Sequence, residues 1–232
     1  MVAEPIVTLE EVSKIYSMGE IKVPALRGVD LEIGKGEMIG IMGPSGSGKT
    51  TLLNLIGALD RPTDGRVIVG GKDITQMNER QLTHVRRESI SFVFQFFNLL
   101  PVLTAYENVE LPLLIANIPE EQRRERVDRL LGLVGLTDRA DHRPDELSGG
   151  EQQRTAIARA LAKPRGASEI IVLADEPTGD LDTQTGEEIM KVLLDLTRKE
   201  GSTLIVVTHD PDVGAKMDKV YNMRDGTIES VT

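Results

Sequence analysis

The chain has 232 residues, of which 40% are hydrophobic and 28% charged, and its formal net charge is -10. This size and composition predict a folded chain and exclude a disordered or membrane-embedded one. The acidic balance argues against broad binding to nucleic acid or anionic lipid, which requires basic surface. Because the sequence has no cysteine, no bilayer-length apolar run and no signal-peptide pattern at its start, we expect a cytoplasmic protein without disulfides.

Short apolar runs and helical stretches alternate along the chain. Strands are predicted, in chain order, at residues 7–16, 31–33, 38–42, 67–69, 90–94, 170–174 and 204–208. The run at 38–42 leads into a glycine-rich turn, and the stretch after this turn is apolar at helical spacing. Alternation of this kind predicts an α/β fold with a parallel sheet.

A purely helical stretch interrupts this alternation. Three helices are predicted there, at 105–116, at 119–134 and after Ser148, with no strand between them. Pro119 is expected in the first turn of the second helix, where its missing N–H costs nothing. We therefore expect one domain over residues 1–232, with a helical subdomain inserted at 96–150.

The glycine-rich turn fits the phosphate-binding pattern G-x-x-x-x-G-K-[ST]. Its residues are Gly43, Pro44, Ser45, Gly46, Ser47, Gly48, Lys49 and Thr50. Glycines let the backbone wrap closely around a phosphate, so that N–H groups and the N-terminus of the following helix point at it. Lys49 adds a positive charge, and the Thr50 hydroxyl can bind Mg²⁺. An incidental glycine turn is disfavoured, because this turn follows a strand and precedes a helix.

Two acids, Asp175 and Glu176, follow the apolar strand predicted at 170–174. The carboxyl edge of a parallel sheet is where α/β proteins bind ligands. Asp175 is suited to hold Mg²⁺, and Glu176 to polarise a water aimed at a phosphate. Alone, such a pair is more often just a strand end, and the P-loop reverses these odds.

The segment LSGGEQQR at 147–154 precedes a strong helix. One interpretation is that Ser148 is a simple N-cap. The other is a second phosphate-binding helix N-terminus, formed by Ser148, Gly149 and Gly150. Local physics leaves these two readings about equal.

Taken together, these motifs resemble the ATP-binding cassette (ABC) family, in which LSGGEQQR lies between a P-loop and a segment like IIVLADEPTGDLD at 170–182. The resemblance covers essentially the whole chain. The segment FVFQFFNLLPVLTAYENVELPL at 92–113 is most similar to the subfamily of ABC proteins that powers lipoprotein release, macrolide efflux and the cell-division cassette. The resemblance implies a P-loop NTPase (RecA-like) core with a parallel sheet, a small antiparallel β subdomain and the inserted helical subdomain.

The resemblance also assigns roles to single residues. It implies that Glu176 is the general base, that Gln95 reaches Mg²⁺ and the attacking water, and that His209 contacts the γ-phosphate. Magnesium would be held by Thr50, Gln95 and Asp175. The nucleotide would be held by Tyr16, stacked on adenine, and by Gly43, Pro44, Ser45, Gly46, Ser47, Gly48, Lys49, Thr50, Thr51, Ser148, Gly149 and Gly150. On local grounds alone, Tyr16 could be a core aromatic and His209 a structural residue.

The architecture of the family implies partners as well. Two cassettes would pack head to tail when ATP binds, with each ATP between the P-loop of one copy and Ser148–Gly150 of the other. Asp182 would lie in the segment that crosses to the second copy. The homodimer would drive a separate integral membrane permease for export or lipid and lipoprotein extraction, which would place the chain peripherally at the inner face of the cell membrane. Nucleic acid is not expected as a partner.

Two local features depart from the family pattern. The link near residues 164–168 is longer than expected, and we assign the extra residues to a surface loop. The segment Gly179-Asp180-Leu181-Asp182 replaces the commoner Ser-Ala-Leu-Asp, which leaves the role of Asp180 open. The alternative functions are a non-transport ABC ATPase, a P-loop kinase, which would need an acceptor site, and a nucleotide sensor without turnover, which the intact Glu176 and His209 disfavour.

Overall fold

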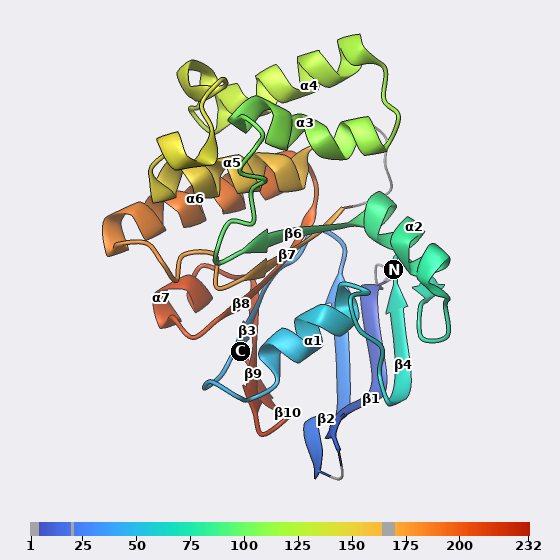
Figure 1. Ribbon diagram of the computed structural model, residues 1–232. Helices are drawn as coiled ribbons and strands as arrows, with labels where there is room; N and C mark the ends of the chain where they lie inside the picture. The colour runs from blue at the N-terminus through green and yellow to red at the C-terminus, as the bar shows by residue number, and fades with distance from the viewer. Residues whose placement is uncertain (1–4, 20, 164–169) are drawn as a thin grey trace.

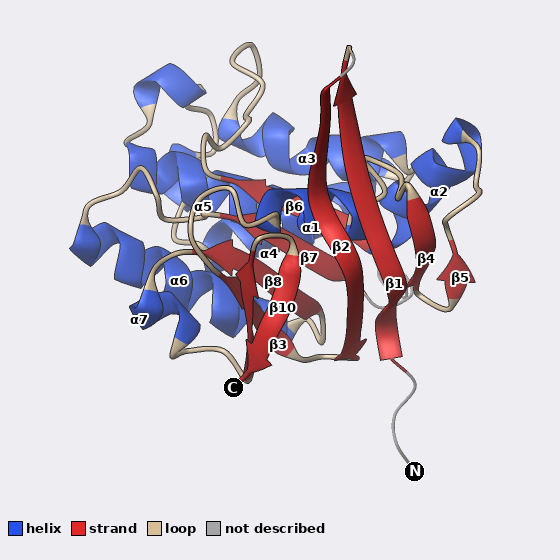
Figure 2. Ribbon diagram, turned by 90° about the horizontal axis from the view of Figure 1, so that it is seen from below, coloured by secondary structure: helices blue, strands red, loops and turns tan. Residues whose placement is uncertain are grey.

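The computed structural model describes residues 5–19, 21–163 and 170–232. Its first sheet is antiparallel and has the strand order β2-β1-β4-β5 (Figure 2). These strands are β1 (Pro5–Met18), β2 (Ile21–Gly34), β4 (Asp64–Val69) and β5 (Lys72–Asp73). The small antiparallel subdomain that the resemblance implied is therefore present.

The second sheet has six strands in the order β10-β9-β3-β8-β7-β6. They are β3 (Met38–Met42), β6 (Ile90–Phe94), β7 (Ile171–Asp175), β8 (Thr203–Thr208), β9 (Lys219–Arg224) and β10 (Thr227–Val231). Strands β9, β3, β8, β7 and β6 run parallel, and β10 pairs antiparallel with β9 at the edge. The predicted parallel sheet is thus confirmed, with an antiparallel edge strand added.

Helices cover both faces of this sheet (Figure 1). They are α1 (Lys49–Ile56), α2 (Glu79–Ser89), α3 (Ala105–Ile115), α4 (Glu120–Leu133), α5 (Gly149–Leu161), α6 (Thr183–Lys199) and α7 (Pro211–Gly214), with 3-10 turns η1 (Thr137–Arg139) and η2 (Pro144–Glu146). Helix α1 lies between the two sheets, whereas α3, α4, α5 and α6 lie beyond the other face of the six-stranded sheet.

The central strands are continuous apolar runs because both of their faces are buried. Along β7, Ile171 and Leu173 join the hydrophobic cluster around α1, whereas Val172 and Ala174 join the cluster beneath α5 and α6. Strand β8 alternates in the same way. The strand periodicity of two therefore splits each run between two cores and fixes which strand ends meet at the carboxyl edge.

Several element boundaries differ from the sequence prediction. The strand expected at 31–33 is the end of β2, whose first half is exposed and therefore lacks an apolar signal. Strand β7 begins one residue later than expected, and β5, β9, β10 and α7 were not predicted. Pro119 is the N-cap of α4 rather than a residue of its first turn, because its ψ of 145° is extended.

Between β6 and α5 the described chain is helical, with α3, α4, η1 and η2. The limits of the inserted subdomain stay a prediction, since α5 packs on α3 and α4 and also on α6 and β6. The loop expected near 164–168 lies outside the described residues. Among the described residues, every helix is too short or too polar to span a lipid bilayer.

Candidate functional site

The glycine-rich turn joins the carboxyl end of β3 to the N-terminus of α1. Gly43 passes so close to the backbone that a side chain there would meet the Met223 carbonyl and the Ser47 hydroxyl. Gly48, with φ of 99°, is in the left-handed region and lies against the Ala25 carbonyl. Both positions therefore require glycine. Gly48 is the N-cap of α1 and supplies no side-chain cap, so the first amides of this helix stay available to an anion.

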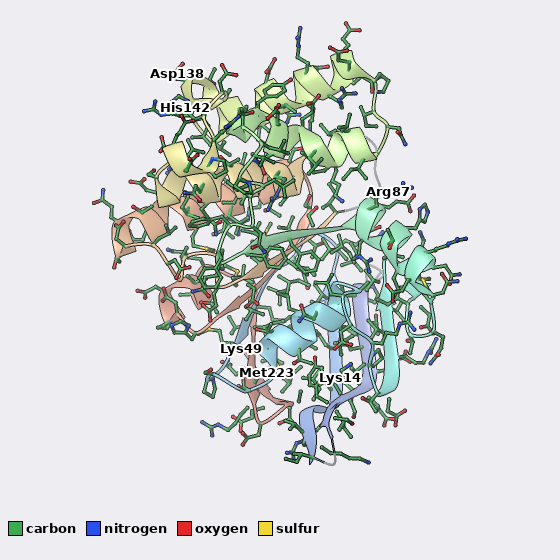
Figure 3. All side chains as sticks on the ribbon, in the orientation of Figure 1. Lys14, Lys49, Arg87, Asp138, His142 and Met223 are labelled. Carbon is green, nitrogen blue, oxygen red and sulfur yellow. The ribbon has the colours of Figure 1, made fainter. Side chains whose placement is uncertain are left out.

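Lys49 is the first residue of α1 and lies at this end of the helix (Figure 3). Its Nζ donates to the carbonyl oxygens of Gly43 at 2.7 Å and Pro44 at 3.0 Å. Lys49 is 8% exposed, and its ammonium is held across the turn by these two bonds. A positive charge is therefore already placed where the uncapped amides converge.

Asp175 ends β7 opposite the turn. Thr50 Oγ1 lies 3.5 Å from Asp175 Oδ1, although the two residues are 125 positions apart in the sequence. Burial raises the pKa of Asp175, and the negative charge of Glu176 adds to this effect, whereas the contact with Thr50 and the charge of Lys49 lower it. The site thus joins a hydroxyl and a carboxylate oxygen, the hard donors that Mg²⁺ prefers.

Glu176 has a left-handed backbone, with φ of 46°. Its N–H donates to the Val207 carbonyl at 2.9 Å, which holds the residue against the end of β8. One carboxylate oxygen lies 2.9 Å from His209 Nδ1, and the other accepts from Thr208 Oγ1 at 3.3 Å. A strained non-glycine residue of this kind costs about 1–3 kcal/mol and is typical of functional sites. The turn aims the carboxylate at the cleft instead of along the strand.

Gln95 follows β6 at the same edge of the sheet. Its Nε2 donates to Asp180 Oδ1 at 3.0 Å. The backbone of Gly179 also passes close by, since a Cβ there would lie 3.0 Å from Gln95 Nε2. Sequence reasoning missed this contact, because nothing local connects residues 95 and 180.

These residues line one cleft of about 800 Å³, within the size range of small-molecule sites. Of the predicted site residues, it is lined by Pro44, Ser45, Gly46, Gly48, Lys49, Thr50, Thr51, Gln95, Asp175, Glu176 and His209. Gly43 and Ser47 belong to the glycine-rich turn but do not line the cleft. The cleft is also lined by Val23, Pro24, Ala25, Gly179 and Val207, which the sequence did not single out.

Tyr16 was predicted to stack on the adenine of the nucleotide. It does not line the cleft, and its side chain is 38% exposed. Its hydroxyl donates to Asp60 at 2.8 Å, and Lys14 Nζ lies 4.9 Å from its ring centroid. The predicted stacking of Tyr16 on adenine stays a prediction.

Ser148, Gly149 and Gly150 lie apart from the cleft, at the N-terminus of α5. Ser148 is the N-cap, and its Oγ accepts from the Glu151 N–H at 3.4 Å and donates to Glu151 Oε2 at 2.8 Å. The Ser148 N–H also donates to this carboxylate at 2.8 Å. Within one chain, the N-cap interpretation of Ser148 therefore holds, and the segment contributes nothing to the cleft.

The segment after Gln95 is held by α5. Phe97 and Asn98 both have left-handed backbones, with φ of 56° and 48°. Arg159 of α5 donates to the Phe97 carbonyl at 2.9 Å and to the Asn98 carbonyl at 2.5 Å. Burial lowers the pKa of Arg159. Helix α5, whose N-cap is Ser148, is therefore hydrogen-bonded to the segment that follows Gln95.

Residues 26–179 match the family model of ABC transporters. An uncharacterized ABC transporter ATP-binding protein of Thermotoga maritima is 52% identical over 226 residues, which cover 97% of this chain and 94% of the relative. The macrolide export ATP-binding/permease protein MacB of Brucella melitensis is 46% identical over 232 residues, and the chain spans 35% of its length.

Solved structures agree with the sequence relatives. The dimeric structure of the ATP-binding cassette MJ0796 in a post-hydrolysis state, bound to ADP and Pi, superposes with a TM-score of 0.86 at 46% identity. The match covers 97% of each chain. An uncharacterized ABC transporter ATP-binding protein named MJ0796 is from Methanocaldococcus jannaschii. The fold and the family predicted from the sequence are both confirmed, and the chain belongs to the ATP-binding proteins of the ABC transporter family.

Proposed function

We propose that the chain binds ATP in the cleft and hydrolyses it to ADP and phosphate. The observation that carries this proposal is the position of Glu176, whose carboxylate lies in the cleft with the P-loop and is oriented by His209 Nδ1 and Thr208 Oγ1. A carboxylate held in this way can accept the proton of a water that attacks the γ-phosphorus. The bond from this phosphorus to the β-γ bridging oxygen then breaks, and ADP leaves.

The P-loop residues act on the phosphates in this scheme. The uncapped N-terminus of α1 and the Lys49 ammonium meet the negative charge. His209 has an exposed side chain, 72% accessible, so its ring can contact a bound phosphate while Nδ1 orients Glu176. The closeness of Gly179 to Gln95 leaves little room between the two loops that flank the cleft.

Magnesium fits the residues present. Thr50 and Asp175 place a hydroxyl and a carboxylate oxygen together, and Gln95 adds an amide on the same cleft. Mg²⁺ binds through one or two protein oxygens, substrate phosphates and water, and these residues can supply the protein oxygens. When bound, the ion neutralises charge on the β- and γ-phosphates.

The second half of the site comes, in this proposal, from another copy of the chain. Ser148–Gly150 present a second helix N-terminus that does not reach the cleft of its own chain. A head-to-tail homodimer would bring each such segment to the ATP of the other copy. The dimer of MJ0796 bound to ADP and Pi, at 46% identity, supports this arrangement.

We further propose that the dimer drives a separate membrane permease for export or extraction. The MacB relative combines ATP-binding and permease functions in its name, and this chain matches 35% of its length. Large apolar side chains are exposed on the segment after Gln95 and on α3, namely Phe96, Leu100, Val102, Leu114 and Ile115. Exposed apolar groups of this kind are typical of interaction surfaces. Binding there would place the chain at the inner face of the membrane.

Two measurements on a Glu176→Gln variant test the mechanism: phosphate release reports hydrolysis, and light scattering reports the molecular mass. Glutamine preserves the shape of the side chain but cannot accept the proton, so we expect phosphate release to fall at least about 100-fold. With Mg-free ATP the variant should double its mass, and in a separate assay with Mg²⁺ and ATP the wild-type protein should release phosphate slowly. Glu121→Gln, an exposed change on α4, serves as the control and should hydrolyse like the wild type.

Four outcomes would contradict the proposal. A Glu176→Gln variant that hydrolyses like the parent would mean that another group is the base. A protein that stays monomeric at saturating ATP would argue against the shared site. Binding without any wild-type turnover would favour the nucleotide sensor, and recovery of a nucleic-acid complex instead of a membrane protein in a pull-down would favour the non-transport ATPase.

A further inference from the structure

The contact between Gln95 and Asp180 joins two loops at the rim of the cleft. Gln95 follows β6 and Asp180 follows β7, and Gln95 Nε2 donates to Asp180 Oδ1 at 3.0 Å. The neighbouring Gly179 has no side chain, and a Cβ there would lie 3.0 Å from Nε2 and 3.1 Å from Cδ of Gln95. The Gln95 amide is therefore held by a hydrogen bond and by the close backbone of the same loop.

The chemistry of the two groups decides which way the amide faces. An ionised carboxylate only accepts hydrogen bonds, whereas an amide has one accepting and one donating end. Asp180 can therefore bind only the NH₂ end of Gln95. The carbonyl oxygen Oε1, at the opposite corner of the planar amide, is left for the cleft that Gln95 lines.

The orientation matters because the two ends of an amide suit opposite ligands. A hard cation or the proton of a water needs the carbonyl oxygen, and the NH₂ end would repel the cation. An alanine at position 180 would leave the amide free to rotate, and an asparagine could bind either end. Aspartate is the residue that enforces one orientation.

We propose that Asp180 is a positioning residue, which orients the Gln95 amide so that its oxygen is offered to Mg²⁺ and the attacking water. This inference rests on the proposed function of the cleft. It gives a role to the Gly-Asp-Leu-Asp segment that its sequence leaves open. Asp182 in the same segment has a different task, since its side chain accepts from the Thr185 N–H at 3.0 Å and caps α6.

Metal binding in the inactive background tests this inference. Mn²⁺ is titrated into Glu176→Gln protein saturated with ATP, and its affinity is measured by electron paramagnetic resonance. Adding Asp180→Ala should weaken Mn²⁺ binding about tenfold, the usual effect of removing a group that orients a metal ligand. The affinity for metal-free ATP should not change. Asp195→Asn, an exposed change on α6, is the matched control.

A reciprocal pair of variants distinguishes orientation from a merely structural role. A Gln95→Glu carboxylate has two accepting oxygens, so either of them can face the cleft and no partner is needed to orient it. Adding Asp180→Ala to Gln95→Glu should therefore not weaken Mn²⁺ binding, whereas a structural role of Asp180 would weaken it in both backgrounds. Circular dichroism melting of each variant checks that the fold is retained.

The outcomes separate this inference from the proposed function. If the parent binds ATP and Mn²⁺ but Asp180→Ala binds Mn²⁺ equally well, the positioning role is wrong. It is equally wrong if the double variant Gln95→Glu/Asp180→Ala binds Mn²⁺ more weakly than Gln95→Glu alone. If the parent itself binds no ATP, the function proposed for the cleft fails, and the inference fails with it.

Discussion

Two helix N-termini in this chain are candidates for phosphate binding, and the fold treats them differently. Helix α1 starts after Gly48, with no side-chain cap and no acid in its first turn. Helix α5 starts after Ser148, whose capping box with Glu151 pairs the Ser148 N–H with the Glu151 carboxylate and the Glu151 N–H with the Ser148 hydroxyl. The hydrogen bonds from Ser148 lower the pKa of Glu151, which keeps this carboxylate charged. A free helix end can bind an anion at once, whereas a satisfied one must exchange partners first.

One chain therefore holds only half of the proposed site. The N-terminus of α1 lies in the cleft together with Lys49 of the same helix and with Asp175 and Glu176 at the carboxyl edge of the sheet. The N-terminus of α5 lies outside the cleft, and the capping box of Ser148 and Glu151 stabilises it within one chain. We therefore expect nucleotide binding to depend on the first end and dimer formation on the second.

The largest effect is expected at the first end, from Lys49→Ala. The change removes the positive charge at the P-loop and the bonds that close it on Gly43 and Pro44. Phosphate release should fall about 10²- to 10³-fold, as when other charge-stabilising donors are removed. Steady-state turnover at saturating ATP measures this, with Lys191→Ala, exposed on α6, as the control. Retention of more than half of the activity would contradict the role of Lys49.

A smaller effect is expected at the opposite, C-terminal end of α5. Lys163, just after α5, donates to the carbonyl oxygens of Arg87 at 2.8 Å and Ile90 at 3.0 Å, at the end of α2. Burial lowers the pKa of Lys163 from 10.5 to about 8. Between these pH values the unfolded chain binds more protons than the folded one, so the free energy of unfolding should rise with pH.

Comparison with Lys163→Met isolates this contribution. From pH 8 to 10.5, the free energy of unfolding of the wild type should rise by on the order of 2 kcal/mol relative to that of the variant. This is less than the free energy that corresponds to the full pKa difference, because the hydrogen bonds to the carbonyl oxygens favour the charged amine. Urea unfolding followed by circular dichroism at several pH values measures the difference. Parallel pH curves for the two proteins would show that Lys163 keeps its ordinary pKa.

The smallest effect on stability is expected from Ser148→Ala, which tests the second end. Loss of the cap should cost about 1 kcal/mol of unfolding free energy. Asn78→Ala, which removes the equivalent capping box of α2, should cost about the same and is the matched control. In the Glu176→Gln background, only Ser148→Ala should weaken the ATP-dependent dimer. Equal dimerisation of both variants would mean that Ser148 is only a cap.

The sequence by itself determined the features that depend on neighbouring residues. Strands 38–42 and 90–94 were predicted with their observed ends, because each is a short buried run bounded by polar or glycine residues. The P-loop and the cap at Ser148 were readable for the same reason, since glycine conformation and N-cap hydrogen bonds involve residues at most a few positions apart. The resemblance then supplied the family and the fold.

Tertiary structure alone decided which of these pieces meet. The contacts of Thr50 with Asp175, 125 residues apart, and of Gln95 with Asp180, 85 residues apart, follow from strand order in the parallel sheet. The tertiary structure also leaves Ser148 outside the cleft, although the sequence motif alone left its role open. No local pattern contains this information, because strand pairing joins segments of any separation and each apolar run fits several neighbours.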